Sequence, residues 1–220
     1  MGVDATRLTT GYFFRSPAVL RWIYTGLTWR LPGDERRLYL TFDDGPVPGP
    51  TEFVLGELNR VKAKATFFCI GDNVLKNPAV FSRILDEGHA VGNHTHNHLS
   101  GWKTSLEDYI SNVKQCDEVI IAHSGGRVQT IAYFRPPYGR ITRRQISAID
   151  HHQIIMWDVL TNDYARNLPE EACLRGSITA TRPGSIIVFH DSLKAERNLR
   201  HALPRFLDHF SSIGFSFHSL

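Results

Sequence analysis

The sequence predicts an α/β fold in one domain, an irregular β/α barrel of about seven parallel strands, and three observations lead to it. The chain has 220 residues, which suits a single barrel domain. Short β-rich runs alternate with helical patterns from residue 37 onward, as parallel strands with right-handed crossovers require. Polar residues follow six predicted strands, whose carboxyl ends share one rim. Only a barrel closes that rim into a ring on which these polar residues can converge at one site. The pattern therefore favours a barrel over an open doubly wound sheet.

Each predicted element rests on a local pattern. Apolar and β-branched residues predict strands at 38–42, 65–70, 90–92, 131–134, 154–157, 185–189 and 215–217. Apolar residues at helical spacing predict helices at 51–61, 80–87, 106–122, 143–150, 170–179 and 199–211. The pair Thr104 and Glu107 predicts a capping box in front of the third helix. No linker or repeat interrupts the pattern, so we expect residues 1–220 to form one domain with its motifs in 37–217.

The segment before residue 37 is predicted to be a helical extension, 1–36. Within 12–29, apolar side chains recur at helical spacing and predict one amphipathic helix: Val19, Leu20, Ile23, Tyr24 and Leu27. Interruptions by charged residues and a proline exclude a signal peptide and a spanning helix. We expect this helix to close one end of the domain; the alternative is peripheral contact with a membrane surface through Arg15, Arg21 and Arg30. The absence of a signal peptide favours the cytoplasm, with the cell envelope as the alternative.

Composition excludes several classes of protein. Hydrophobic residues make up 42% of the chain and charged residues 21%, values that support a packed core rather than disorder. The net charge of +3 argues against a nucleic-acid surface. The three cysteines, Cys69, Cys116 and Cys173, form no CxxC pair and resemble small buried hydrophobic residues. Nothing in the sequence indicates an oligomeric state.

The polar residues at the predicted rim suggest a metal centre. The stretch GNHTHNHL places His94 and His98 one turn apart if it begins a helix, so both imidazoles would reach one ion while His96 points elsewhere. Asp44, in the stretch TFDDGP, adds a carboxylate from another strand end. Two nitrogens and one oxygen leave positions free for water and substrate, as in a catalytic zinc site.

The neighbouring acid then has a separate task. If Asp44 binds the cation, Asp43 remains ionised beside it and acts as a base. Arg135 opens the stretch RPPYG and is expected to hold that base with a bidentate pair. The prolines and Gly139 of this stretch would fix the backbone so that an N–H near Tyr138 points inward.

Five motifs together resemble the polysaccharide deacetylases, carbohydrate esterase family four, which contain the NodB-like homology domain. They are TFDDGP, NHTHNH, RPPYG, WDVLTNDY and IIVFHD, in that order and each at a strand end. The resemblance covers about 37–217. It implies a distorted (β/α)7–8 barrel and a metal-dependent hydrolase that removes acetyl groups from N-acetylated sugars of the chitooligosaccharide or peptidoglycan type. One divalent ion is implied, with zinc expected first and cobalt or nickel as alternatives.

The resemblance also implies a role for each residue of the motifs. Asp43 matches the base, Arg135 the residue that orients it, and His190 the general acid. Asp163 matches the acid that tunes that histidine, and the amide of Tyr138 matches an oxyanion donor. The metal ligands match Asp44, His94 and His98.

Two positions depart from the family pattern. Tyr164 replaces a tryptophan that commonly lines the acetyl pocket, and Val188 replaces a leucine. Both keep an apolar wall while changing its volume, which puts acyl preference in doubt. Trp102 and Trp157, with Tyr164, are candidates for stacking on sugar rings, although aromatic residues more often belong to a core.

Other polar residues have structural explanations. We expect His89 and His96 to be structural histidines, Asp158 to hydrogen-bond behind the site, and Asp191 to start the last helix. Two further functions stay open. The same ligand set serves two-histidine-one-carboxylate iron enzymes, and a carbohydrate-binding protein would keep the fold without turnover. The base Asp43 and the acid His190 favour hydrolysis.

Overall fold

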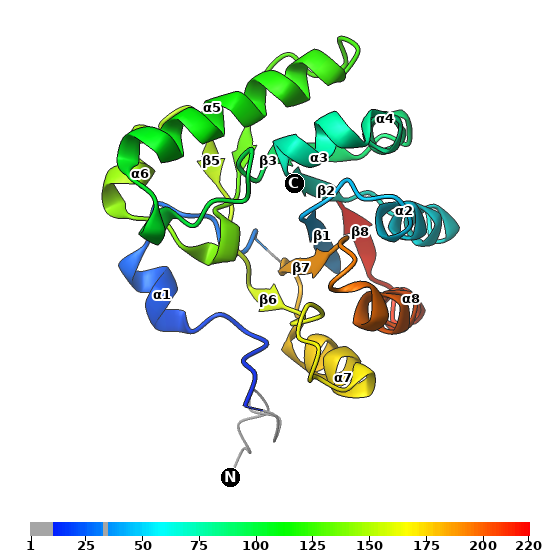
Figure 1. Cartoon of the computed structure of the whole chain (residues 1–220). Helices are drawn as coiled ribbons and strands as arrows, with labels where there is room; N and C mark the ends of the chain where they lie inside the picture. The colour runs from blue at the N-terminus through cyan, green and yellow to red at the C-terminus, as the bar shows by residue number, and fades with distance from the viewer. Residues whose placement is uncertain (1–10, 33–34) are drawn as a thin grey trace.

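A single curled sheet of parallel strands forms the centre of the molecule in the computed structural model, which describes residues 11–32 and 35–220. Its strand order is β5-β4-β3-β2-β1-β7-β6, and β8 pairs with β1 (Figure 1). The strands are β1 Arg37–Asp43, β2 Thr66–Cys69, β3 Ala90–Asn93, β4 Tyr133–Phe134, β5 Gln153–Ile154, β6 Val159–Leu160, β7 Ile186–His190 and β8 Ser216–His218. This curled, mostly parallel sheet confirms the predicted distorted barrel.

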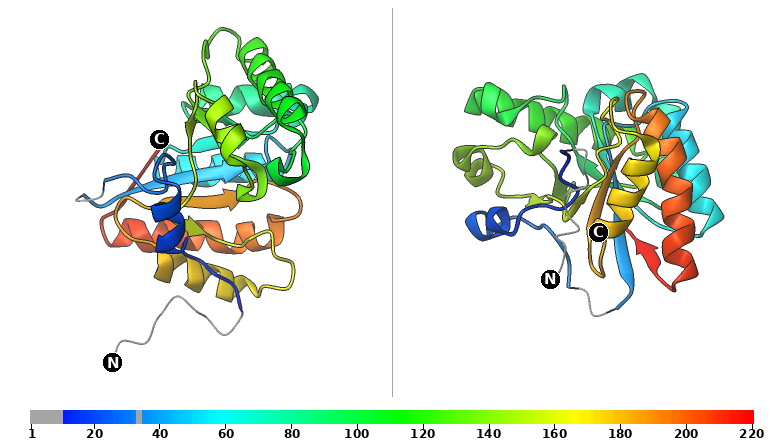
Figure 2. Two further views of the ribbon diagram at one scale, coloured as in Figure 1. Left: turned by 90° about the vertical axis from the view of Figure 1, so that its left-hand side faces the viewer. Right: turned by 90° about the horizontal axis from the view of Figure 1, so that it is seen from below.

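Helices surround the sheet on its outer side (Figures 1 and 2). They are α1 Ala18–Ile23, α2 Pro50–Arg60, α3 Gly71–Lys76, α4 Pro78–Asp86, α5 Leu106–His123, α6 Arg143–Ala148, α7 Glu170–Ala180 and α8 Glu196–Ser212. Two short 3-10 turns, η1 Gly101–Lys103 and η2 Pro137–Gly139, lie in the connecting loops. Within the described residues, no helix has the length and apolar character needed to cross a membrane.

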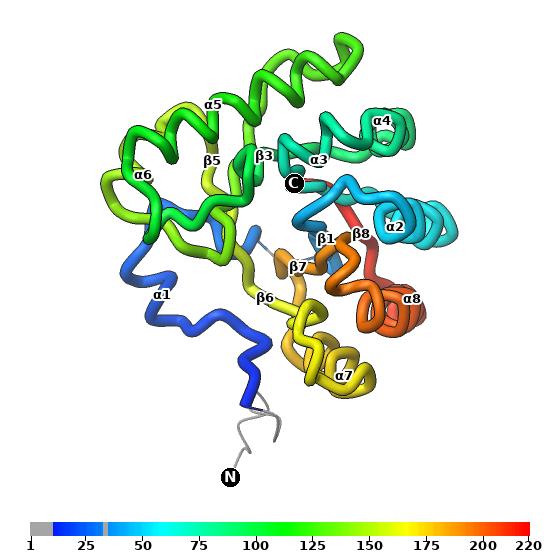
Figure 3. Tube along the Cα trace, viewed as in Figure 1, coloured from blue at the N-terminus to red at the C-terminus, as the bar shows by residue number. Residues whose placement is uncertain are grey.

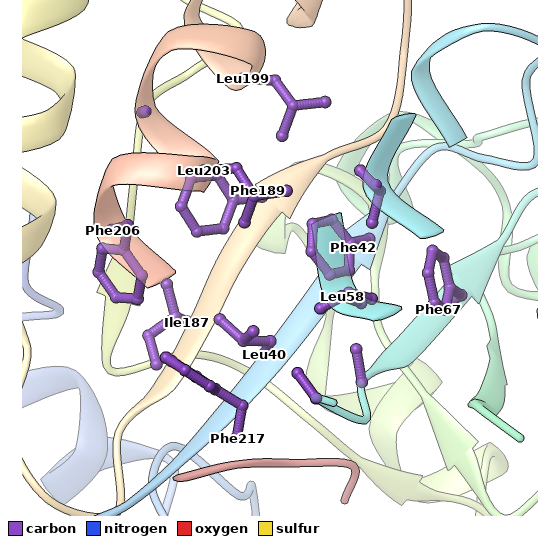
Figure 4. Close-up of a cluster of buried hydrophobic side chains, with 14 of the residues drawn as sticks. Leu40, Phe42, Leu58, Phe67, Ile187, Phe189, Leu199, Leu203, Phe206 and Phe217 are labelled. Carbon is purple, nitrogen blue, oxygen red and sulfur yellow. The ribbon is translucent and has the colours of Figure 1, made fainter. Parts of the chain in front are cut away.

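The largest core lies between β1, β7 and the helices α2 and α8, and Figure 4 shows its centre. Alternate residues of β1 point into it, so Leu40 and Phe42 contact the layer that holds Ile187 and Phe189 of β7. The rings of Phe42 and Phe189 stack with centroids 6.0 Å apart. Each such fully buried side chain contributes about 1.5–3 kcal/mol. This core fixes the strands whose carboxyl ends carry the polar residues.

The sheet is not closed by direct pairing of β5 with β6 in the described part of the chain. The N-terminal segment lies in that opening and follows both edges (Figure 3). Arg15 bridges Val159 of β6, and Thr28 bridges Ile155 just after β5. Backbone hydrogen bonds of 2.7–3.0 Å accompany these bridges on both sides. The barrel is therefore completed by a segment that runs between two strands.

The predicted N-terminal helix is present, but it is shorter than the apolar pattern suggested and does not bury an apolar face. The helix α1 has six residues, and none of them is buried. A helix gains most of its stability by burying an apolar face, whereas the buried residues of this segment, Phe14, Leu27 and Trp29, lie in its extended parts. Trp22 is 86% exposed on α1. Contact of α1 with a membrane stays a prediction.

The other predicted elements are confirmed within a few residues, but the helix α3 and the strand β6 were not predicted. The strand β6 was missed because it has two residues and no apolar run of its own. The predicted capping box at Thr104 was also wrong. Ser105 is the N-cap of α5, and its hydroxyl accepts a hydrogen bond from the N–H of Asp108 at 3.1 Å. A capping residue one position later satisfies the same free N–H groups.

Candidate metal and catalytic site

The two adjacent acids at the end of β1 have different partners. Asp43 is the last residue of the extended strand, whereas Asp44 has a φ of 81°. A positive φ in a residue other than glycine costs about 1–3 kcal/mol, so the surroundings must hold it. The side chain of Asn73 contributes by donating to the carbonyl oxygen of Asp44 at 2.7 Å. As a result, Asp43 contacts an arginine and Asp44 contacts two histidines.

The arginine that contacts the first acid is completely buried. Arg135 donates through Nη1 to Asp43 Oδ1 at 2.6 Å and to the hydroxyl of Thr41 at 2.7 Å. Its other nitrogens donate to the carbonyl oxygens of Ile155 and Met156. The predicted bidentate pair with Asp43 is therefore wrong, because the remaining donors satisfy backbone carbonyls. Burial lowers the pKa of Arg135, while Asp43 acts in the opposite direction. The contacts fix one oxygen of Asp43 and leave the other available.

The two histidines lie on a loop and not on a helix, which corrects the sequence prediction. Thr95 and His98 have φ values of 62° and 56°, and a right-handed helix excludes such values. Side chains hold the loop instead. Asn93 accepts from the N–H of Thr95 at 2.7 Å, and Asn112 accepts from two further loop N–H groups at 2.9 and 3.0 Å. These bonds bring the rings of His94 and His98 together, with centroids 5.1 Å apart.

The three predicted ligands, Asp44, His94 and His98, form what we call the catalytic cluster. Their ligand atoms all lie within 4.8 Å of one another. Oδ1 of Asp44 is 3.2 Å from Nε2 of His98 and 3.7 Å from Nε2 of His94. Nδ1 of His94 lies 2.8 Å from the carbonyl oxygen of Arg135, which leaves Nε2 for an ion. Oδ1 of Asp44 is buried and has no hydrogen-bond partner in the described part of the chain. A cation fits this set of donors.

The protonation states of the cluster suit a cation as well. Burial alone would raise the pKa of Asp44, but the close imidazole of His98 and the nearby His190 and His94 bring that pKa well below its usual range. Burial lowers the pKa of His94 to about 4. At neutral pH the cluster therefore offers a carboxylate and a neutral imidazole, the forms that bind metals.

A further polar side chain, His190, lies beside Asp43. His190 ends β7 in register with Asp43, its neighbour across the sheet. Nδ1 of His190 lies 2.7 Å from Oδ1 of Asp163, and the other oxygen of Asp163 accepts the N–H of His190 at 2.8 Å. Burial alone would lower the pKa of His190, but Asp163 raises it to about 9. His190 is therefore protonated at neutral pH and can donate a proton from Nε2.

The residues that depart from the family pattern lie beside this histidine. The ring of Tyr164 packs edge-on against His190 with centroids 5.0 Å apart. Val188 is fully buried and shares a strand face with His190, because residues two apart on a strand point the same way. Tyr138 lies beside His98: the centroids of the two rings are 4.6 Å apart, and Tyr138 has a φ of 60°. The oxyanion role of its backbone N–H stays a prediction.

Asp191 has a different role from the one predicted. It does not start the last helix; its buried carboxylate accepts from the N–H of Gly45 at 3.0 Å and from the hydroxyl of Thr51 at 2.6 Å. Burial raises the pKa of Asp191 to about 8. A Cβ on Gly45 would lie 2.0 Å from Oδ2 of Asp191. The contact fixes the turn that carries Asp44, and the only signal in the sequence was the position of Asp191 directly after His190.

The other polar residues agree with their structural explanations. Nδ1 of His89 lies 3.3 Å from the N–H of Ala65, and His96 is buried outside the catalytic cluster. Asp158 is fully buried behind the site, where it contacts the side chains of Arg21, Arg182 and Ser185. Asp158 therefore fastens the N-terminal segment to the sheet.

An apolar cavity of about 340 Å³ lies next to Tyr138. It is formed where the N-terminal segment meets the loops after β4 and β5, and its wall includes Leu20, Trp102 and Trp157. Trp102 is 65% exposed. Aromatic faces are therefore available beside the catalytic cluster, as the sequence suggested for sugar stacking.

Comparisons with known proteins agree with this geometry. A family model described as polysaccharide deacetylase matches residues 30–157. A peptidoglycan-N-acetylglucosamine deacetylase of Bacillus cereus is 32% identical over 198 residues, which is 87% of this chain and 89% of the relative. A chitooligosaccharide deacetylase of Rhizobium leguminosarum bv. trifolii is 31% identical over 159 residues, covering 72% of this chain and 73% of the relative. The chain spans 58% of another B. cereus relative and 32% of a Listeria monocytogenes one.

Solved structures show the same fold. The Bc1960 peptidoglycan N-acetylglucosamine deacetylase superposes with a TM-score of 0.84 at 27% identity, covering 93% of this chain and 95% of that chain. A Bacillus anthracis protein described as a CE4 family pseudoenzyme superposes with a TM-score of 0.78 at 23% identity, covering 87% and 66%. The fold therefore occurs both with and without activity, and the side chains of the site must decide. The family match covers more than half of this chain, which thus belongs to the polysaccharide deacetylase family.

Proposed function

We propose that this protein is a metal-dependent hydrolase that removes the acetyl group from N-acetylated amino sugars of an oligo- or polysaccharide. One observation carries the proposal: the catalytic cluster lies beside a fixed carboxylate, Asp43, whose neighbour across the sheet is a protonated imidazole, His190. Hydrolysis of an amide needs a base for the attacking water and an acid for the departing amine. Two groups of opposite protonation state beside one cation site supply both.

Asp44, His94 and His98 would hold one divalent ion. When bound, that ion would polarise the amide carbonyl and lower the pKa of a water molecule. Zinc is the first expectation, with cobalt or nickel as alternatives, since two imidazoles and one carboxylate suit these borderline cations.

The chain's own residues then divide the proton transfers. Asp43 accepts a proton from the attacking water through the oxygen that Arg135 leaves free. His190 donates from Nε2 to the amine, which is otherwise too basic to leave. Asp163 keeps the proton of His190 on Nδ1 and orients the ring. The N–H of Tyr138 is proposed to donate to the oxyanion, a contact typically worth about 3–4 kcal/mol.

The substrate class follows from the relatives and from the aromatic side chains near the site. Relatives named for peptidoglycan and for chitooligosaccharides act on N-acetylated sugars. Trp102 and Trp157, beside Tyr138, offer faces on which pyranose rings can stack. Tyr164 and Val188 would bound the acyl group next to His190, so their changed volume is where acyl preference would differ from that of relatives.

An acetate-release assay tests this function. The purified protein is incubated with N-acetylglucosamine oligomers and with peptidoglycan fragments, before and after chelation and after addition of zinc. We expect acetate release that the chelator abolishes and zinc restores. Sugar binding without acetate would support the carbohydrate-binding alternative, and activity that needs iron and dioxygen would support the iron-enzyme alternative. Either result would contradict the proposal.

A further inference from the structure

A second group of one carboxylate and two histidines lies away from the rim. Asp117 is on α5, and His151 and His152 are in the turn that leads into β5. We call these residues the α5 cluster. Its ligand atoms also lie within 4.8 Å of one another. None of the five motifs includes it, and the proposed mechanism does not use it.

The α5 cluster repeats the ligand spacing of the catalytic cluster. Oδ1 of Asp117 is 3.1 Å from Nε2 of His152, and Oδ2 is 3.8 Å from Nε2 of His151. In the catalytic cluster the two carboxylate-to-imidazole distances are 3.2 and 3.7 Å, both measured from Oδ1 of Asp44. With zinc bonds of about 2.0–2.1 Å, donors at tetrahedral corners lie roughly 3.3 Å apart. Small movements of the side chains would place one ion between all three.

The surroundings of the cluster favour a cation as well. The side chain of His152 is completely buried, and the rings of His151 and His152 lie with centroids 4.2 Å apart. Two imidazoles this close repel each other if both are protonated, whereas one cation accommodates both as neutral ligands. Nδ1 of His151 lies 3.4 Å from Oδ1 of Asp150. A carboxylate behind a histidine orients the other ring nitrogen toward a metal.

We propose that Asp117, His151 and His152 bind a second divalent cation of the zinc class, which ties α5 to the turn before β5. His151 is largely exposed, so the remaining coordination position faces solvent and takes water. The cation would have a structural role, because it joins two elements that are distant in sequence.

One residue connects this second site to the first. The amide nitrogen of Asn93 donates to Asp117 Oδ1 and to the carbonyl oxygen of Val113, both at 2.7 Å. The amide oxygen of Asn93 accepts from the N–H of Thr95, inside the loop that carries His94. A cation that fixes the carboxylate of Asp117 would therefore also restrain this loop.

Counting bound metal tests the proposal. The full-length protein is stripped with a chelator, equilibrated with buffered zinc in the low micromolar range, separated from free zinc and analysed for metal content. We expect two ions per chain in the wild type and one in His151→Ala. One ion is also expected in His94→Ala, and none in the double variant. His201→Ala is the matched control, because His201 lies beside two glutamates of α7 but has no second histidine, and it should retain both ions.

Thermal unfolding gives a second readout that needs no activity. Zinc should raise the melting temperature of His94→Ala, in which only the α5 cluster is intact, and the rise should be lost in His94→Ala with His151→Ala. A wild-type chain with a single ion that His151→Ala retains would overturn this proposal and leave the proposed function standing. A wild-type chain that binds two ions but releases no acetate would contradict the proposed function and leave the second cation site standing.

Discussion

The catalytic cluster and the α5 cluster present nearly the same three ligand atoms at nearly the same spacing, but their surroundings differ. The first has the carboxylate of Asp43 beside it and, across the sheet from Asp43, the protonated ring of His190. The second has Asp150, an exposed carboxylate that contacts His151, and Asn93, whose amide is neither an acid nor a base at neutral pH. Ligand spacing alone would give an ion site, and we propose that the neighbouring acid and base are what make the first site catalytic.

The largest effect should come from removing the base. Asp43→Asn keeps the shape of the side chain but cannot accept the proton from water, so we expect acetate release to fall by at least about 1,000-fold. The metal content should not change, because Asp43 is outside both clusters. Activity assays with metal analysis on the same sample check this. Substantial turnover by the variant would contradict the assignment of the base.

Asp163→Asn should give the next largest effect. We expect a loss of about 100-fold at neutral pH, since His190 loses the group that holds its proton. The ring must be protonated to act, so activity falls as the pH rises through its pKa. That pKa is raised to about 9 by Asp163, and the variant should therefore lose activity at a lower pH than the wild type. An alkaline limb that does not move in a pH profile of kcat/KM would exclude His190 as the acid.

Asn93→Ala tests the connection between the two regions. It leaves the buried N–H of Thr95 without its partner, at a cost of about 1–3 kcal/mol, and removes one hydrogen bond each from the carbonyl of Val113 and from Asp117. We expect a lower free energy of unfolding in urea and weaker zinc binding at both clusters. Asn59→Ala is the matched control, because it removes the same amide from an exposed position and should change stability by less than about 0.5 kcal/mol.

His151→Ala should have the smallest effect on activity, a loss of a few-fold compared with the near-complete loss in His94→Ala. The ligands, base and acid of the reaction all remain, and only the restraint through Asn93 is weakened. Initial rates at saturating zinc measure the difference. If His151→Ala and His94→Ala lost the same amount of activity, the two clusters would not have separate roles.

The sequence predicted the barrel and the members of the catalytic cluster because both leave short-range signals. Strand and helix periodicity is local, and polar residues at strand ends share one rim in any parallel sheet. The conformation of the loop at His94 could not be predicted in the same way. Its positive φ values depend on hydrogen bonds that loop N–H groups donate to Asn112, which is on another element.

Two further features depend on contacts that are distant in sequence. The α5 cluster joins Asp117 to a histidine pair more than thirty residues away, so no motif spacing announces it. The N-terminal segment has apolar residues at helical spacing, but the opening between β5 and β6 selects extended backbone on both sides of the short helix α1. In both cases the partner that decides the conformation is absent from the local sequence.

The N-terminal segment between β5 and β6 affects whether molecules of this protein associate with one another. An uncovered strand edge offers free N–H and C=O groups to any other chain in solution. By occupying both edges, the residues around Arg15 and Thr28 leave no such template at the seam of the barrel. Removing these residues would expose the edges of β5 and β6 to other molecules. Intermolecular strand pairing would then compete with folding.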